Sequence, residues 1–208
     1  MGAPRVSLPS MPNDDDPANA PATPPPLDAA ALMALTRPSR FQLWELLHEH
    51  GPAATTHLAA QTGESWETVS SHLEELARHG LVEDAQRVDT ERWWRTRPGA
   101  FSFQPHRFED DPETAEAAHL LETNLLRVHT HRLNRWLAVS RSMPMAWREV
   151  SFDGSMTVHL TPHELGELSA RVLEVLKDFR ARHRDESEPT ARIEVFFHAF
   201  PIALDENH

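Results

Sequence analysis

Residues 55–97 constrain the fold of this chain more than any other stretch, because apolar positions and helix-breaking residues follow one another there in a fixed order. A short apolar helix is expected first, and Gly63 ends it, since glycine tolerates the backbone angles of a turn. Ser65 can cap a second helix, which Gly80 ends. A two-stranded hairpin is expected to follow. Spacings of four and three give the second helix one buried face, made of Val69, Leu73 and Leu76.

Helix, turn, helix and hairpin in this order are the plan of a winged helix-turn-helix domain, in which the hairpin is the wing. Such a domain usually places its second helix in the major groove of DNA. Two more helices are expected before it, the first capped by Asp28 and the second with Pro38 near its start. We therefore expect a DNA-binding domain over residues 27–98.

The second helix has a polar face opposite its apolar face, and arginines crowd the wing. Ser and Thr hydroxyls can contact phosphates or bases, and a Glu carboxylate can accept a hydrogen bond from cytosine. Wing arginines can reach the neighbouring phosphates. The alternative for the polar residues is an ordinary solvated side chain, and for Trp66, at the helix start, it is packing beside the first helices, which is the favoured interpretation. The candidate DNA-contacting residues are Ser65, Trp66, Glu67, Thr68, Ser70, Ser71, Arg78, Arg87, Arg92 and Arg95.

The charge of the chain weakens the DNA-binding interpretation, because phosphate contacts need Lys or Arg. The net charge is −12, and residues 36–98 hold seven Arg against ten Asp or Glu. The second helix is itself acidic. The main alternative is therefore a winged domain used for contact with another protein, with weak or no DNA binding.

Five runs within residues 28–97 carry a resemblance to a known family: 35–40 (LTRPSR), 46–47 (LL), 64–73 (ESWETVSSHL), 76–82 (LARHGLV) and 91–95 (ERWWR). They resemble the winged helix-turn-helix of the ArsR/SmtB-type bacterial repressors. The resemblance implies a homodimeric, ligand-responsive repressor that binds a double-stranded DNA operator. It also implies that the positions of Trp66, Glu67, Ser70 and Ser71 face the major groove. The family often has Gln at the place of Trp66 and His at that of Ser71.

A long amphipathic helix is expected over residues 112–143, after a linker at 99–111. At about 1.5 Å per residue it is about 45 Å long, too long to bury its apolar stripe against one small domain. Pairing with a second copy of the chain is the economical explanation, and packing on its own C-terminal region is the alternative. The residues expected to form the dimer interface are Leu121, Leu125, Val128, Leu133, Trp136 and Leu137.

The remaining residues are assigned by composition and pattern. Residues 1–26 hold eight of the 17 prolines and are expected to be a disordered tail. Residues 144–208 are expected to form a small α+β domain, with strands at 157–160 and 192–200 and a helix from 162 to about 183. The whole chain is therefore expected to be α+β and mainly α.

No cofactor and no enzymatic activity are expected. The chain has no cysteine, which excludes disulfides and thiolate metal sites, and it has no Gly-rich phosphate loop, nucleophile elbow or HExxH motif. Its 14 His do not follow the ligand spacing of the family's metal sensors. Glu116 and His119 share one helix face and are weak metal candidates, although such pairs are usually solvated.

The sequence gives only general indications of the effector and of the cell compartment. Aromatic side chains in the C-terminal part are either core or the lining of a site for a small apolar effector. Neither a membrane-spanning run nor a secretory signal is evident in the sequence, so a cytoplasmic protein, on the nucleoid when bound to DNA, is expected. The aromatic residues concerned are Trp136, Trp147, Phe196 and Phe197.

Overall fold

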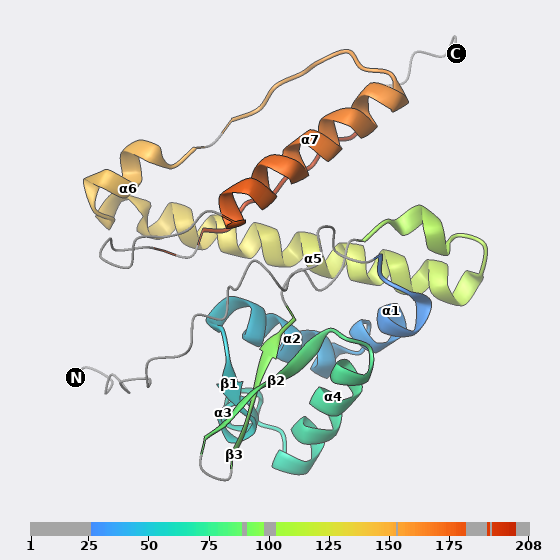
Figure 1. The fold of residues 1–208 in the computed structure, drawn as a ribbon, viewed down its shortest axis with the longest axis vertical. Coiled ribbons are helices and arrows are strands. Elements are labelled where there is room, and N and C mark those ends of the chain that lie inside the picture. The colour runs from blue at the N-terminus through green and yellow to red at the C-terminus, as the bar shows by residue number, and fades with distance from the viewer. Residues whose placement is uncertain are drawn as a thin grey trace. The chain divides into compact units, whose positions relative to one another are not determined.

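Helices packed beside a three-stranded antiparallel sheet form the first part of the chain (Figure 1). The computed structural model describes residues 26–88, 91–97, 103–152, 154–181, 191 and 193–202. The elements of the first part are α1 (Ala29–Leu35), α2 (Pro38–His50), β1 (Ala53–Ala54), α3 (Thr55–Thr62), α4 (Trp66–Arg78), β2 (Val82–Val88) and β3 (Glu91–Thr96). Because α3, α4 and the β2–β3 wing follow in this order, the predicted winged helix-turn-helix fold is confirmed. The predicted disordered tail lies, up to residue 25, outside the described residues.

Local capping sets the ends of these helices where the sequence predicts them. The Asp28 carboxylate accepts a hydrogen bond from the backbone N–H of Ala31 at 2.7 Å. The Ser65 hydroxyl accepts one from the backbone N–H of Thr68 at 3.2 Å, at the start of α4. Gly63 ends α3 with a left-handed φ of 74°, which glycine adopts without steric cost. The turn between α3 and α4 is therefore encoded locally.

β3 is the central strand of the sheet and pairs antiparallel with both β1 and β2. Ala53 of β1 lies opposite Trp94 of β3. The register of the wing shifts between Asp84 and Gln86, where one extra residue on β2 locally increases the twist. The sequence did not predict β1, because two residues are too few to show an alternating pattern.

Trp94 lies at the centre of the core and is fully buried. Its indole N–H donates a hydrogen bond to the Thr55 hydroxyl at 3.1 Å, and that hydroxyl lies 3.4 Å from the backbone carbonyl oxygen of Arg92. These contacts join the first turn of α3 to the central strand. Other large side chains of this core are also fully buried: Leu32, Leu35, Leu43, Leu47, Leu58, Val69, Leu73, Leu76, Leu81 and Val82. The predicted apolar face of α4 is therefore confirmed.

The predicted long helix is α5 (Pro112–Val139), which follows a short 3₁₀ helix (Pro105–Phe108) and precedes another (Ser140–Ser142). The Asp111 carboxylate accepts a hydrogen bond from the backbone N–H of Thr114 at 3.2 Å and so caps the first turn of α5. Its 28 residues span about 42 Å.

Two different faces of α5 are apolar. Leu126, Leu133 and Leu137 are exposed, and their spacings of seven and four place them along one line of the helix. At about 100° per residue, this line lies roughly 140° around the helix from Leu121, which is fully buried. The face around Leu121 consists of Ala117, Ala118, Leu121 and Val128, all buried.

The chain divides into two compact units, residues 1–127 and 128–208. Besides the end of α5, the second unit contains α6 (Met145–Val150) and α7 (Pro162–Ala181) (Figure 1). α7 begins with a capping box, in which Glu164 accepts from the Thr161 backbone N–H at 2.8 Å and Thr161 accepts from the Glu164 N–H at 3.3 Å. The hydrogen bonds from Thr161 lower the pKa of Glu164. The predicted start of this helix is confirmed.

The two strands predicted for the C-terminal unit are wrong over the residues that the structure describes. Neither 157–160 nor 193–200 is a strand, and residue 192 lies outside the description. A strand exists only when another strand completes its hydrogen bonds. Among the described residues, 154–160 and 195–202 make no backbone–backbone hydrogen bond. The described part of this unit is therefore helical, joined by segments without regular structure.

Membrane insertion of a helix finds no support in the described ranges. No helix there combines the length and the apolar character needed to cross a bilayer.

Replacing Thr55 by Val tests the hydrogen bond that joins α3 to the central strand. The Trp94 indole N–H then stays buried without an acceptor, and we expect the free energy of unfolding to fall by about 1–3 kcal/mol in urea titrations. In a Trp94→Phe background the same change should cost clearly less, because the donor is already gone. An equal cost in both backgrounds would contradict this role for the hydrogen bond.

Replacing Ser65 by Ala tests the cap of α4. We expect a loss of about 0.5–2 kcal/mol in the free energy of unfolding, because the N–H of Thr68 loses its acceptor. The matched control is Ser71→Ala, which makes the same chemical change on the exposed face of the same helix and should stay within about 0.5 kcal/mol. Similar losses in the two variants would argue against capping.

Candidate nucleic-acid interface

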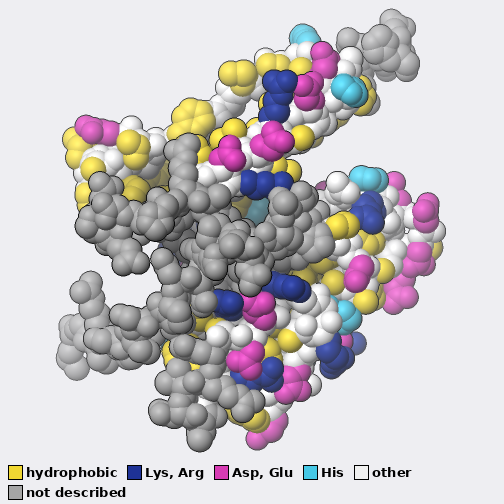
Figure 2. Space-filling model, viewed as in Figure 1, with side chains coloured by type: hydrophobic (Ala, Val, Ile, Leu, Met, Phe, Trp, Pro, Cys, Tyr) yellow, Lys and Arg dark blue, Asp and Glu magenta, His cyan; other side chains and the backbone are white. Residues whose placement is uncertain are grey.

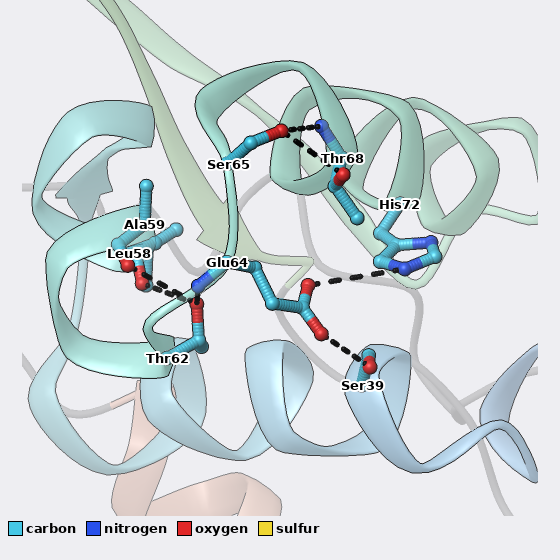
Figure 3. Close-up of polar contacts among 8 residues, drawn as sticks. All are labelled: Ser39, Leu58, Ala59, Thr62, Glu64, Ser65, Thr68 and His72. Atoms are coloured by element: carbon cyan, nitrogen blue, oxygen red, sulfur yellow. Dashed lines mark hydrogen bonds and ion pairs between the residues drawn. The ribbon is translucent and has the colours of Figure 1, made fainter.

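The turn that precedes α4 is held by hydrogen bonds within the chain (Figure 3). The Thr62 hydroxyl donates to the carbonyl oxygen of Leu58 at 2.9 Å and accepts from the backbone N–H of Glu64 at 3.4 Å. The Ser65 hydroxyl lies 3.0 Å from the hydroxyl of Thr68. It also accepts the hydrogen bond from the Thr68 backbone N–H that caps α4. The first turn of α4 therefore has a fixed position relative to α3.

Glu64 attaches this turn to α2. One of its carboxylate oxygens accepts a hydrogen bond from the Ser39 hydroxyl at 2.5 Å, and the other lies 3.9 Å from Nε2 of His72 (Figure 3). Ser39 stands in the first turn of α2 and His72 in the middle of α4, so one carboxylate joins α2, α4 and the turn that precedes α4. Sequence reasoning missed Glu64 and Ser39 as positioning residues, because they are 25 residues apart and follow no motif.

α4 presents the polar face that the sequence predicts. Trp66 is 49% exposed, and Glu67, Thr68 and Ser71 are exposed beside it. Ser70 is half-buried. Glu67 and Ser71 stand on the helix face opposite Val69, Leu73 and Leu76, with Thr68 and Ser70 on its flanks, whereas Trp66 is exposed at the first residue of the helix. Ser65 and Arg78, at the two ends of the helix, are exposed as well.

Glu67 gives the first turn of α4 a negative charge. Hydrogen bonds from its own backbone N–H and from the Ser65 hydroxyl lower the pKa of its carboxyl group. The side chain is therefore ionised at neutral pH. It occupies the end of the helix dipole that would otherwise attract a phosphate. Such a carboxylate can accept from a base amino group but repels the backbone of DNA.

Arg92 of the wing is already engaged by acidic side chains. Its Nε atom lies 2.7 Å from a carboxylate oxygen of Asp84, and another guanidinium nitrogen lies 3.7 Å from Glu74 of α4. The guanidinium also lies 3.9 Å from the ring centroid of Trp94. These contacts place the cation between the wing and α4, where a phosphate must compete with two carboxylates for it.

The other predicted arginines follow the same pattern where the structure describes them. Arg95 pairs with Glu83 at 2.8 Å, and Arg78 pairs with Glu75. The backbone of Arg87 in β2 lies opposite Arg92 in β3, but its side chain lies outside the described residues. Basic and acidic side chains accordingly lie next to one another on this unit, as Figure 2 shows.

The weak metal candidates do not gather a ligand set in the described ranges. No group of three His, Asp or Glu side chains there could hold a metal ion. Glu116 and His119 are both exposed on α5.

The predicted dimer-interface residues fall into two groups on α5. Leu121 and Val128 are buried within the chain, whereas Leu133 and Leu137 are exposed. Leu125 and Trp136 are half-buried. Only part of the predicted set is therefore accessible to a second copy, and Leu126 extends the accessible line.

No protein-family model and no curated protein matches the chain. Among solved structures, it is similar to one described as a possible transcriptional regulator for arsenical resistance, with 24% identity over 46% of this chain and 83% of that chain and a TM-score of 0.31. It is also similar to the homodimeric winged helix-turn-helix DNA-binding domain of a possible ArsR-family regulator from Mycobacterium bovis. That match has 26% identity over 50% of this chain and 82% of that chain, and a TM-score of 0.33. TM-scores of this size are too low to establish a shared fold. The winged helix-turn-helix is assigned from the order of the elements and the register of the sheet.

Proposed function

We propose that the chain is a sequence-specific DNA-binding transcriptional regulator in which α4 enters the major groove and the wing contacts the neighbouring backbone. The observation that carries the proposal is the exposed polar face of α4 beside the wing, on a helix whose first turn Glu64 fixes to α2. A helix of 13 residues with small hydroxyl side chains fits a groove about 12 Å wide. The resemblance to ArsR/SmtB-type repressors supports the same function.

The contacts divide by chemistry. Ser71 and Thr68 on the exposed face of α4 supply hydroxyls for base edges, and Glu67 supplies a carboxylate that accepts from cytosine. Arg92 supplies the phosphate contact once it exchanges its carboxylate partners for DNA. Affinity then depends on a competition between phosphates and acidic side chains of the protein itself.

Two copies of the chain would read two half-sites. The exposed line of Leu126, Leu133 and Leu137 on α5 supports pairing with a second copy, because leucines spaced along one helix face exclude water when two such helices meet. A twofold dimer places its two recognition helices about one turn of DNA apart. The resemblance to the ArsR/SmtB-type repressors further implies that the chain represses transcription and that a small effector relieves this repression.

A protein-interaction module with weak or no DNA binding is the second candidate. The ion pairs of Arg78, Arg92 and Arg95 with carboxylates favour it, since they lower the positive charge that DNA binding needs. The two functions differ in their response to salt and to loss of single arginines.

DNA binding is tested with a fragment from the region upstream of the protein's own gene in gel shifts over a salt series. We expect a specific shift at low salt, and Arg92→Ala should weaken binding to all sequences and reduce the salt slope by about 1, because one phosphate contact is lost. Ser71→Ala should instead alter sequence preference. Arg107→Ala is the matched control, because it removes an exposed arginine outside the wing. Absence of any specific shift at low salt would sink the proposal.

Competition for Arg92 is tested by neutralising its partners. The double variant Asp84→Asn, Glu74→Gln should tighten DNA binding roughly two- to fivefold, the range expected when exposed ion pairs no longer hold the cation. The matched control is Asp110→Asn with Glu109→Gln, which removes the same charges from an exposed segment after the wing. If both double variants tighten binding equally, the effect is one of net charge and the specific competition is refuted.

A further inference from the structure

The C-terminal unit has almost no core of its own. In the part that the structure describes, Val128 is the one buried apolar residue of this unit, while twenty large apolar side chains between residues 133 and 202 are exposed. Many of them are visible at the surface in Figure 2, in yellow. Helices of this kind gain most of their stability from packing of an apolar face, so the unit requires a partner.

The exposed apolar area matches the requirement of one protein partner. A side chain of this size presents roughly 60–120 Å² of apolar surface, so twenty of them at about half exposure leave roughly 600–1,200 Å² on each chain. A stable protein interface buries about 800 Å² on each partner. A small apolar effector covers far less than this area.

Segment 193–202 contacts α5 through alternate residues. Glu194 pairs with Arg132, and the rings of Phe196 and His198 lie 4.0 Å and 5.5 Å from the ring of His129, between centroids. The residues between them are not covered: Ile193, Val195 and Phe197 are 64%, 56% and 45% exposed. The alternate contacts match the side-chain geometry of a β-strand, although both faces keep exposed surface, since Phe196 is itself 36% exposed.

His129 is half-buried beside this segment, and this lowers its pKa. Desolvation, with the nearby positive charges of His198 and Arg132, lowers the pKa of His129. The imidazole is therefore held in its neutral form, which suits a ring packed against Phe196.

Two segments show no strand pairing among the residues that the structure describes. As noted above, residues 154–160 and 195–202 make no backbone–backbone hydrogen bond among the described residues. Segment 154–160 also alternates, with Met156, Val158 and Leu160 apolar. Unpaired backbone groups beside exposed apolar side chains can pair with another chain to form a strand.

We propose that segment 193–202 of one copy pairs as a β-strand with segment 154–160 of a second copy, and that the exposed apolar face of the C-terminal unit is buried in this contact. The inference rests on the homodimer of the proposed function and names its interface. Twofold symmetry forms the contact twice, so each chain both gives and receives one strand. The contact continues the exposed line of α5, because Leu133 and Leu137 belong to the same unit.

The test begins with the oligomeric state of the full chain, by analytical ultracentrifugation. We expect a dimer at micromolar concentration, and Phe197→Asp should raise its Kd roughly tenfold or more by placing a charge in the interface. The monomer should keep its helical circular dichroism, because Phe197 is largely exposed. Leu120→Asp is the matched control: Leu120 is 47% exposed but lies in the first unit, and its substitution should leave the Kd unchanged. A monomeric wild-type chain, or a Phe197→Asp variant that dimerises normally, would overturn the proposal.

Cysteine pairing then decides between exchange and pairing within one chain. The protein has no native cysteine, so chains carrying Val158→Cys can be mixed with chains carrying Val195→Cys or Phe197→Cys under oxidation. We expect disulfide-linked dimers in the mixtures and few in either chain alone. If cross-linked dimers fail to form and the double variants on one chain close an internal disulfide instead, the strands pair within the chain and the exchange is refuted.

Gel shifts with DNA fragments that carry one or two half-sites distinguish failure of this interface from failure of DNA binding. If both hold, Phe197→Asp loses the tighter binding to two half-sites and keeps weak binding to one. If the wild-type chain binds neither fragment, the DNA-binding function fails, while the ultracentrifugation and cross-linking still decide the interface.

Discussion

Burial of Trp94 is the constraint on which the first unit depends. Its indole is fixed to Thr55 at the start of α3, its backbone pairs with β1, and its ring supports the guanidinium of Arg92. One side chain thus links the core, the helix-turn-helix and the wing. The position of the Arg92 guanidinium is therefore tied to the best-buried aromatic residue, so stability and the geometry of the proposed DNA-contacting surface are coupled.

Several acidic residues of the chain form ion pairs with the arginines near the candidate interface. The negative charges near the candidate interface are not spread at random, since Asp84, Glu74 and Glu83 lie against the arginines proposed to contact DNA. In the proposed complex with DNA, phosphates replace these partners, which lowers the affinity for every DNA sequence alike. In the proposed complex, discrimination between sequences falls to the hydroxyls of Thr68 and Ser71 and to the carboxylate of Glu67.

Local signals in the sequence predicted local structure well. Asp28, Ser65 and the Thr161–Glu164 capping box set helix starts, because each acts within one turn of the chain. The bond between Ser39 and Glu64 could not be predicted, since it depends on how α2 packs beside α4. The prediction of strands at 157–160 and 192–200 was wrong for a related reason. An alternating pattern shows that a segment could form a strand, but the strand also needs a second segment to complete its hydrogen bonds. Glu67, Thr68 and Ser71 of α4 are exposed as expected, whereas Ser70 is half-buried, and the contacts of all of them with DNA stay a prediction.

The line of exposed leucines on α5 has a geometric consequence. From Leu126 to Leu137 it covers eleven residues in three turns, which is about 3.67 residues per turn and close to the natural pitch of an α-helix. Two helices that meet along such a line need no left-handed supercoil, in contrast to a heptad seam. Such a pair would be nearly straight over the length of the contact.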